Sequence, residues 1–145
     1  MTRQTRSHLA PGTAGIAALV AMSACLFAGW ASPAAAAHGN LFKAALRIGV
    51  LIAFGTDSGV YPHGMNGIEF GLMTELGMSP AAALLAGTRD AAKLLGVDAD
   101  VGTLQAGKVA DIVAVPGNVL SDIHATEHPV FVMHQGRIVV QKSGT

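Results

Sequence analysis

The hydrophobic pattern of residues 40–96 predicts one strand accompanied by helices. Asn40 is a suitable cap for a helix that runs through Arg47 and stops at Gly49. The apolar positions that we expect on one face of this helix are Leu41, Ala44, Ala45 and Ile48. The continuous apolar run Val50–Phe54 then suits a strand that is buried on both faces, as in a parallel sheet covered by helices.

Three further helices are predicted after a glycine-rich loop over residues 55–67. The first has apolar residues at helical spacing and ends at Gly77; these residues are Ile68, Leu72, Met73 and Leu76. Ser79-Pro80 starts the second, which runs to about Ala86. Thr88 is expected to cap the third, over residues 89–95, before Gly96.

The pattern becomes strand-like after Val97. A strand is expected over Ala110–Val115, and Val130–Met133 pairs with Arg137–Val140 as a hairpin around Gln135-Gly136. The chain thus divides into a strand-and-helix part over residues 41–96 and a β part over residues 97–142.

Residues 1–37 have the features of a secretory signal peptide. Arg3 and Arg6 are basic, Gly15–Ala28 is apolar, and a run of small residues follows. We expect cleavage after Ala37 or Ala36 and therefore a secreted or periplasmic protein. A retained membrane anchor and a lipid-modified Cys25 are the alternatives, and in the first of them the signal segment is the only part that meets a membrane.

Charge and cysteine content limit the partners and the chemistry that we expect of this protein. The whole chain has a formal net charge of zero, so no electrostatic attraction to nucleic acid is predicted. Cys25 is the only cysteine and lies within the signal, so the mature chain is expected to contain neither disulfides nor a thiolate nucleophile.

The chemistry predicted from the sequence centres on Asp57. It follows the apolar strand run in Gly55-Thr56-Asp57-Ser58-Gly59, and a carboxylate at the C-terminal end of a buried strand is where α/β barrels place catalytic groups. Such a carboxylate can bind Zn²⁺ and exchange a proton with metal-bound water. An aspartate that merely caps the turn is the alternative.

Residues 42–140 resemble the C-terminal end of the metal-dependent amidohydrolase superfamily, particularly members that act on aminoacyl-proline dipeptides and imidazolonepropionate-like amides. Besides the Asp57 segment, the resemblance rests on Gly102-x-Leu104-x-x-Gly107-Lys108-x-Ala110-Asp111-Ile112-Val113. It implies an α/β fold: the last strand and helices of a (β/α)8 barrel, followed by C-terminal strands of a small β-sandwich. Lys108 and Asp111 are expected to be structural.

The resemblance also implies roles for individual residues. Asp57 is the expected catalytic group and ligand of Zn²⁺ or a similar divalent metal. The segment containing Tyr61, His63 and Asn66 corresponds to the part placed over the active site, so we expect these residues to bind a small amide or dipeptide substrate. From the residues alone, a loop histidine, a buried hydroxyl and a turn amide are the alternatives. Glu69 is interpreted as a favourable charge at a helix N-terminus.

A second possible metal motif is His124-Ala125-Thr126-Glu127-His128, which matches the H-x-x-E-H pattern. That pattern binds zinc only when both histidines share one helical face, and Pro129 disfavours the α conformation at His128. We therefore expect a polar connection between strands.

Two functional hypotheses remain open. A catalytic zinc ordinarily needs three protein ligands, whereas the mature chain has no His-x-His pair and one expected ligand, Asp57. The chain is also too short for a barrel of roughly 250 residues, and its strand over residues 50–54 is expected to have two unpaired edges. The first hypothesis is a truncated amidohydrolase cleaving carbon–nitrogen bonds; the second is a non-catalytic remnant or envelope interaction protein. The isolated chain is expected to be inactive and prone to aggregation.

Overall fold

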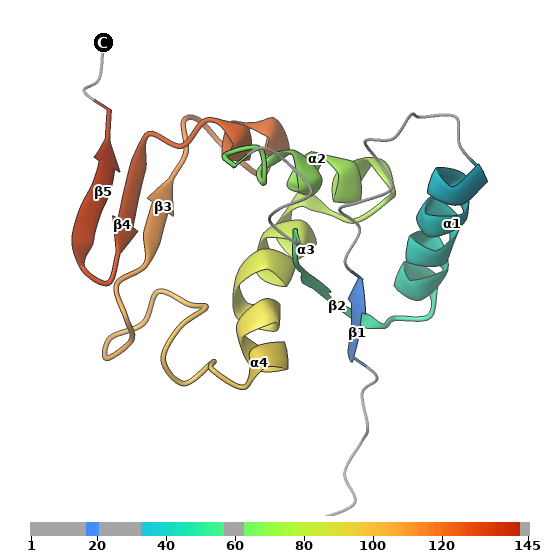
Figure 1. Cartoon of the computed structure of the whole chain (residues 1–145), viewed down its shortest axis with the longest axis horizontal. Coiled ribbons are helices and arrows are strands. Elements are labelled where there is room, and N and C mark those ends of the chain that lie inside the picture. The colour runs from blue at the N-terminus through green and yellow to red at the C-terminus, as the bar shows by residue number, and fades with distance from the viewer. Residues whose placement is uncertain (1–16, 21–32, 57–62, 143–145) are drawn as a thin grey trace, which may run out of the picture.

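A computed structural model describes residues 17–20, 33–56 and 63–142. The chain forms a mixed α/β structure in which helices surround a two-stranded sheet and a separate three-stranded antiparallel sheet follows. In Figure 1 the three-stranded sheet lies at one side of the molecule, α1 lies at the other, and β2 lies between them with α2–α4.

The longest described helix is α1, Pro33–Arg47, and it leads into the strand β2, Leu51–Phe54. Gly49 ends the helix with a φ of +74°, and the Val50 amide donates a hydrogen bond to the Ala45 carbonyl, which closes a Schellman motif. The predicted stop and strand are confirmed. The predicted start is wrong, because α1 begins seven residues before Asn40, and the preferred cleavage site after Ala37 falls within it.

The buried face of α1 also differs from the predicted one. Phe42 is completely buried, with Ala45 and Leu46 packed against the same core, whereas Leu41 and Ile48 are 64% and 78% exposed. Gly39 allows close packing here, since a Cβ at this position would lie 3.3 Å from Leu76 Cδ2. The stripe that faces the core is therefore offset by one residue from the expected one.

A short strand, β1, Ala17–Val20, pairs in parallel with β2 over its whole length. This pairing corrects the expectation that both edges of the residue 50–54 strand are unpaired, because β1 covers one of them. The register joins Ala17 to Leu51 and Val20 to Phe54. β1 belongs to the stretch predicted to be the apolar part of a signal peptide, and that prediction concerns residues that lie largely outside those described.

Helix α2 spans Ile68–Glu75, and Gly77, just after it, has a φ of +107° that stops the helix from continuing, as predicted. Helix α3, Pro80–Leu85, begins at Ser79, whose hydroxyl accepts a hydrogen bond from the Ala82 amide at 3.3 Å. The chain then continues through a π-helical turn, Ala86–Asp90, into α4, Ala91–Leu95. The predicted break at Thr88 is wrong: its hydroxyl donates to the Leu84 carbonyl within the helical run instead of capping a new helix.

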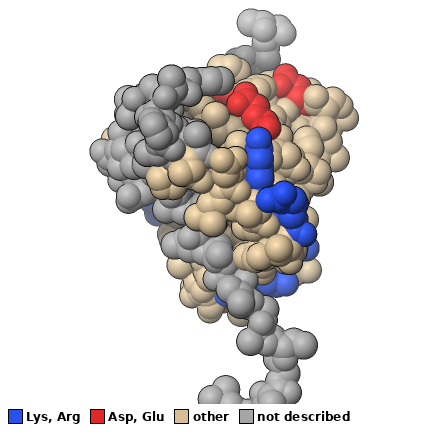
Figure 2. Space-filling view, turned by 90° about the vertical axis from the view of Figure 1, so that its right-hand side faces the viewer, with Lys and Arg blue, Asp and Glu red and all other residues tan. Residues whose placement is uncertain are grey.

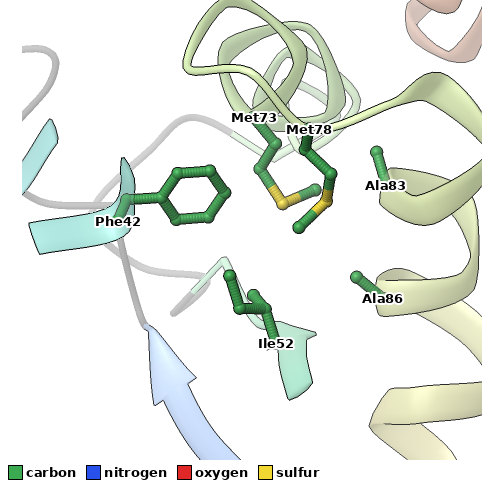
Figure 3. Packing of buried hydrophobic residues seen from close by; sticks show 6 residues of the cluster. All are labelled: Phe42, Ile52, Met73, Met78, Ala83 and Ala86. Carbon is green, nitrogen blue, oxygen red and sulfur yellow. The ribbon is translucent and has the colours of Figure 1, made fainter. Parts of the chain in front are cut away.

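The core of this part lies between β2 and the surrounding helices. Figure 3 shows the Phe42 ring directed toward Met73, Met78 and Ile52, with Ala83 and Ala86 on the far side. All six residues are buried. Because they come from α1, β2, α2, α3 and the turns next to them, this cluster holds the elements of the chain's first half together.

The antiparallel sheet has the order β3–β4–β5: Ile112–Ala114, Phe131–His134 and Arg137–Gln141. Gln135 and Gly136 both have positive φ, as a tight hairpin turn requires, so the predicted hairpin is confirmed. Asp111 Oδ1 accepts hydrogen bonds from the Gln135 amide at 2.7 Å and from His134 Nδ1 at 2.9 Å. The bond from Gln135 is the main cause that lowers the pKa of Asp111, and it supports the structural role expected for this residue.

Lys108 also has the structural role that we expected. Its ammonium group donates to the carbonyl oxygens of Asp98 at 2.5 Å and Val101 at 3.2 Å, so it ties together the turns that follow α4. A cleft of about 340 Å³ next to these turns is lined mainly by polar and charged side chains, including Arg89, Lys93 and Lys108. Arg89 is itself paired with Asp90.

Charged groups are sparse on the face of the molecule that carries α1. Figure 2 shows basic side chains that follow one another down this face below a few acidic ones, further basic side chains near its edges, and mostly uncharged residues among the rest of the described ones. None of the described helices is both long and apolar enough to cross a membrane.

Candidate active site

The C-terminal end of β2 is tied directly to the turn before α2. Asn66 Nδ2 donates a hydrogen bond of 2.7 Å to Thr56 Oγ1, which lies immediately before Asp57 in the sequence. This bond joins the two ends of the loop that contains Asp57 and Tyr61. Both of those predicted site residues lie outside the described residues, so their roles stay predictions.

Of the predicted substrate-binding residues, His63 and Asn66 are described. His63 is exposed in a turn, next to Gly64 with a φ of +95°. Asn66 is partly buried, and its amide is engaged with Thr56. The Asn66 side chain therefore links the C-terminal end of β2 to the start of α2. His63, three residues earlier in the sequence, lies on the surface.

An aromatic pair also holds the first turn of α2 against the end of β2. The rings of Phe54, the last residue of β2, and Phe70 are stacked with centroids 4.7 Å apart. Gly87 makes room for this pair, since a Cβ there would lie 2.8 Å from the Phe70 ring and 3.3 Å from the Phe54 ring. Two independent contacts, one polar and one aromatic, thus seat the start of α2 against the end of β2.

Glu69 lies in this seated turn and is only 4% exposed. Its Oε2 atom is buried without a hydrogen-bond partner. Burial raises the pKa of Glu69 from 4.5 to about 7, because the charged carboxylate loses the water that would solvate it. The helix-dipole interpretation of Glu69 is therefore incomplete: the side chain faces the interior, one turn before the core residue Met73.

The sequence contains a signal for this position, which the helix-dipole interpretation overlooks. Residues 69, 72, 73 and 76 follow the spacing of one helical face, so Glu69 falls on the same apolar stripe as Leu72, Met73 and Leu76. A carboxyl group on the buried face of a helix departs from the usual surface position of glutamate. Such a departure marks a residue as a candidate for a functional role.

The outer side of this turn is covered by a 3-10 helix, Ile123–Glu127, which contains most of the His124–His128 segment. Thr126 Oγ1 donates to the Gly67 carbonyl at 3.1 Å, and a Cβ on Gly71 would lie 2.7 Å from the His124 ring. His124 Nδ1 is 2.6 Å from Glu127 Oε1, and this hydrogen bond is the main cause that raises the pKa of His124. The segment connects β3 to β4 and packs on α2, in agreement with the expected polar connection.

The described residues do not by themselves fit a divalent metal. They include no group of three or more His, Cys, Asp or Glu side chains arranged to hold an ion. The donor set that a zinc ion ordinarily requires is therefore not supplied by the described part of the chain.

Comparison with known proteins agrees with the class of fold described above. The sequence pattern of the Amidohydrolase family matches residues 32–140, so the chain belongs to the amidohydrolase family. Ochratoxinase of Aspergillus niger is 36% identical over 109 residues, and imidazolonepropionase of Rubrobacter xylanophilus is 36% identical over 104 residues. A crystal structure of an Xaa-Pro dipeptidase with bound methionine is 40% identical, with a TM-score of 0.68.

These similarities cover most of this chain and a small share of each relative. The matches span 72% of this chain and 22% of ochratoxinase, 70% and 23% for the imidazolonepropionase, and 71% and 25% for the dipeptidase. The chain therefore corresponds to about a quarter of the length of these relatives. The family resemblance inferred from the Asp57 and Gly102–Val113 segments is confirmed.

Proposed function

We propose that this chain carries part of the active site of a hydrolase that cleaves carbon–nitrogen bonds in small amides or dipeptides. Membership of the amidohydrolase family supports a hydrolytic function, and the named relatives include a dipeptidase and ochratoxinase. The single observation that carries the proposal is the seating of α2 on the C-terminal end of β2 through Asn66 and Thr56. That contact defines a strand-end loop in which Asp57 is the acidic residue.

In this proposal residues 41–96 correspond to the end of a barrel, and residues 97–142, which contain the β3–β5 sheet, to strands of an adjoining small sandwich. Asp57 is the group that exchanges a proton during hydrolysis, first as base and then as acid. His63 and Asn66 border the substrate, together with Tyr61. A divalent ion such as Zn²⁺, which the family relationship implies, would polarise the scissile carbonyl group and activate water.

A chimera provides the sharpest test, because the chain corresponds to only about a quarter of the length of these relatives. Residues 41–142 would replace the matching segment of the Xaa-Pro dipeptidase that is 40% identical. We expect the chimera to hydrolyse an aminoacyl-proline dipeptide and Asp57→Asn to lower its kcat/KM by about a hundredfold or more. Asp98→Asn, in the turns after α4, is the matched control and is expected to retain the activity of the chimera.

Steady-state kinetics of the three purified chimeras decide the outcome. Equal activity of the Asp57→Asn and unsubstituted chimeras would show that this carboxylate takes no part in the reaction. A folded chimera with bound metal and no turnover would also contradict the proposal, because the transplanted segment would then lack a working site.

A further inference from the structure

The cleft of about 340 Å³ lies between the helical run that ends in α4 and the turns that lead to β3. Figure 1 shows these turns as the coil between α4 and β3. Small-molecule sites have volumes of roughly 300–1,000 Å³, so the cleft has the size of a small one. We propose that it binds a phosphate group, as the free ion or as a monoester of a small molecule. The proposal goes beyond the proposed function and does not rest on it.

The helical side of the cleft supplies two cations, Arg89 from the π-helical turn and Lys93 from α4. The buried Asp90 orients the Arg89 guanidinium group: Nε donates to Oδ1 at 2.7 Å and Nη2 to Oδ2 at 3.2 Å. A guanidinium group has five N–H donors, so three are left after this pairing. Lys93 is exposed and forms no ion pair with any residue that the structure describes. Both side chains therefore keep donors for a further acceptor.

The opposite side of the cleft consists of turns that are tied to one another and to the helix. Lys108 Nζ donates to the carbonyl oxygens of Asp98 and Val101, which leaves one of its three N–H groups for another acceptor. Gly102 brings the turns close to the helix, because a Cβ there would lie 2.5 Å from the Ala92 Cβ. The two sides are thus held in place by contacts within the chain, and the cleft is formed before any ligand arrives.

The charge of the lining favours an anion. Lys108 donates only to neutral carbonyl groups and Lys93 forms no ion pair, so no carboxylate of the described residues pairs with either ammonium group. Arg89 is neutralised by Asp90, and the exposed carboxylate of Asp98, which also lines the cleft, offsets one further charge. The cleft is therefore net positive in a chain whose formal net charge is zero.

A phosphate group suits the arrangement of these donors. Besides the three cations, the cleft contains the Gln105 amide, whose Oε1 atom accepts a hydrogen bond from Thr103 Oγ1 at 3.2 Å, so its Nε2 hydrogens stay available. A phosphate group has at least three acceptor oxygens pointing in different directions and carries nearly two negative charges near neutral pH. It can pair with two N–H groups of a guanidinium on one side and accept from ammonium groups on the other. A carboxylate has two oxygens in one plane and a single charge, so it satisfies fewer of these donors.

The test titrates the ¹⁵N-labelled full chain with inorganic phosphate and, separately, with methyl phosphate at about pH 8, where both are largely doubly charged. Sodium chloride keeps the ionic strength constant, so that general screening does not change. We expect saturable shifts of the backbone amide resonances over residues 98–108, with a Kd in the millimolar range. The ligand that binds more tightly identifies the free ion or the monoester as the preferred form.

Lys93→Gln is the variant that reports on the site. It removes one cation and leaves the Arg89–Asp90 pair and the Lys108 contacts in place, so we expect the Kd for phosphate to rise about three- to tenfold. Lys43→Gln removes the same charge from an exposed position of α1, which does not line the cleft. This matched control is expected to keep the Kd of the unsubstituted chain. Unchanged resonances outside the cleft show that each variant is folded.

Two results would overturn the proposal. Shifts that grow linearly with phosphate concentration, or that are spread over the exposed lysines of the chain, would show non-specific attraction only. An equal Kd for Lys93→Gln and Lys43→Gln would show that phosphate does not bind in the cleft. The titration uses neither substrate nor metal, so its failure is distinct from failure of the proposed hydrolytic function.

Discussion

Replacing Phe42 with alanine is expected to lower the free energy of unfolding by about 3–5 kcal/mol. Phe42 is the largest fully buried side chain of the described residues, and its ring is enclosed by Ile52, Met73 and Met78 (Figure 3). The substitution removes apolar contacts and leaves a cavity where α1, β2 and α2 meet. Urea denaturation followed by circular dichroism measures the effect.

Leu41→Ala is the matched control for this prediction. Leu41 precedes Phe42 in the same helix and is 64% exposed, so its truncation is expected to change the free energy of unfolding by less than about 1 kcal/mol. The pair also tests which face of α1 packs on the core. Should Leu41→Ala cost as much as Phe42→Ala, the helix would be rotated relative to the packing described above.

The second large effect is expected at Gly102, where alanine should cost about 2–4 kcal/mol. Its φ of +87° is unfavourable for a residue with a side chain, and a Cβ would lie 2.5 Å from the Ala92 Cβ. The added atom would also lie 3.1 Å from the Thr88 carbonyl oxygen, so the backbone leaves it little room. Thermal unfolding of the variant measures the loss.

Gly107→Ala separates the cost of the positive φ from the cost of the close contact that an added Cβ would make. Gly107 has a nearly identical φ of +89°, but no atom lies within 4 Å of a Cβ built there. We expect only the backbone cost of about 1–2 kcal/mol at this position. Equal losses at the two glycines would show that the turns after α4 do not pack closely on that helix.

The elements of this fold were predictable where local chemistry fixes them. Gly49, Gly77 and Gly96 end helices with positive φ, and Ser79 begins one through its hydroxyl. Each of these signals acts within a few residues of the chain and is independent of tertiary packing. The strand after Gly49 and the hairpin of the C-terminal sheet followed from equally local patterns.

The errors arose where distant parts of the chain decide the outcome. Two neighbouring stripes of α1 are apolar, and only the packing of Phe42 on β2 and α2 selects between them. The pairing of β1 with β2 joins residues more than thirty positions apart, which no local pattern specifies. Thr88 is a residue type that often caps helices, but the helical backbone continues through it as a π-helical turn.

The candidate site was predictable only in part, because some of its contacts join parts of the chain that are not neighbours in the sequence. Asp57, Tyr61, His63 and Asn66 stand out in the loop sequence, and the structure adds that Asn66 binds Thr56. Glu69 was visible in the sequence as a glutamate on an apolar stripe. Its unpartnered oxygen, however, depends on which neighbours pack around it, and that emerges only from the folded chain.

Paramagnetic broadening by Mn²⁺ tests the proposed site most directly, because it detects even weak metal binding by the full chain. NMR resonances of Thr56, His63 and Asn66 should broaden at lower Mn²⁺ concentrations than those of the β4–β5 hairpin, and Asp57→Asn should abolish this selectivity. Broadening centred elsewhere, or unchanged in Asp57→Asn, would contradict a metal-handling carboxylate at the end of β2.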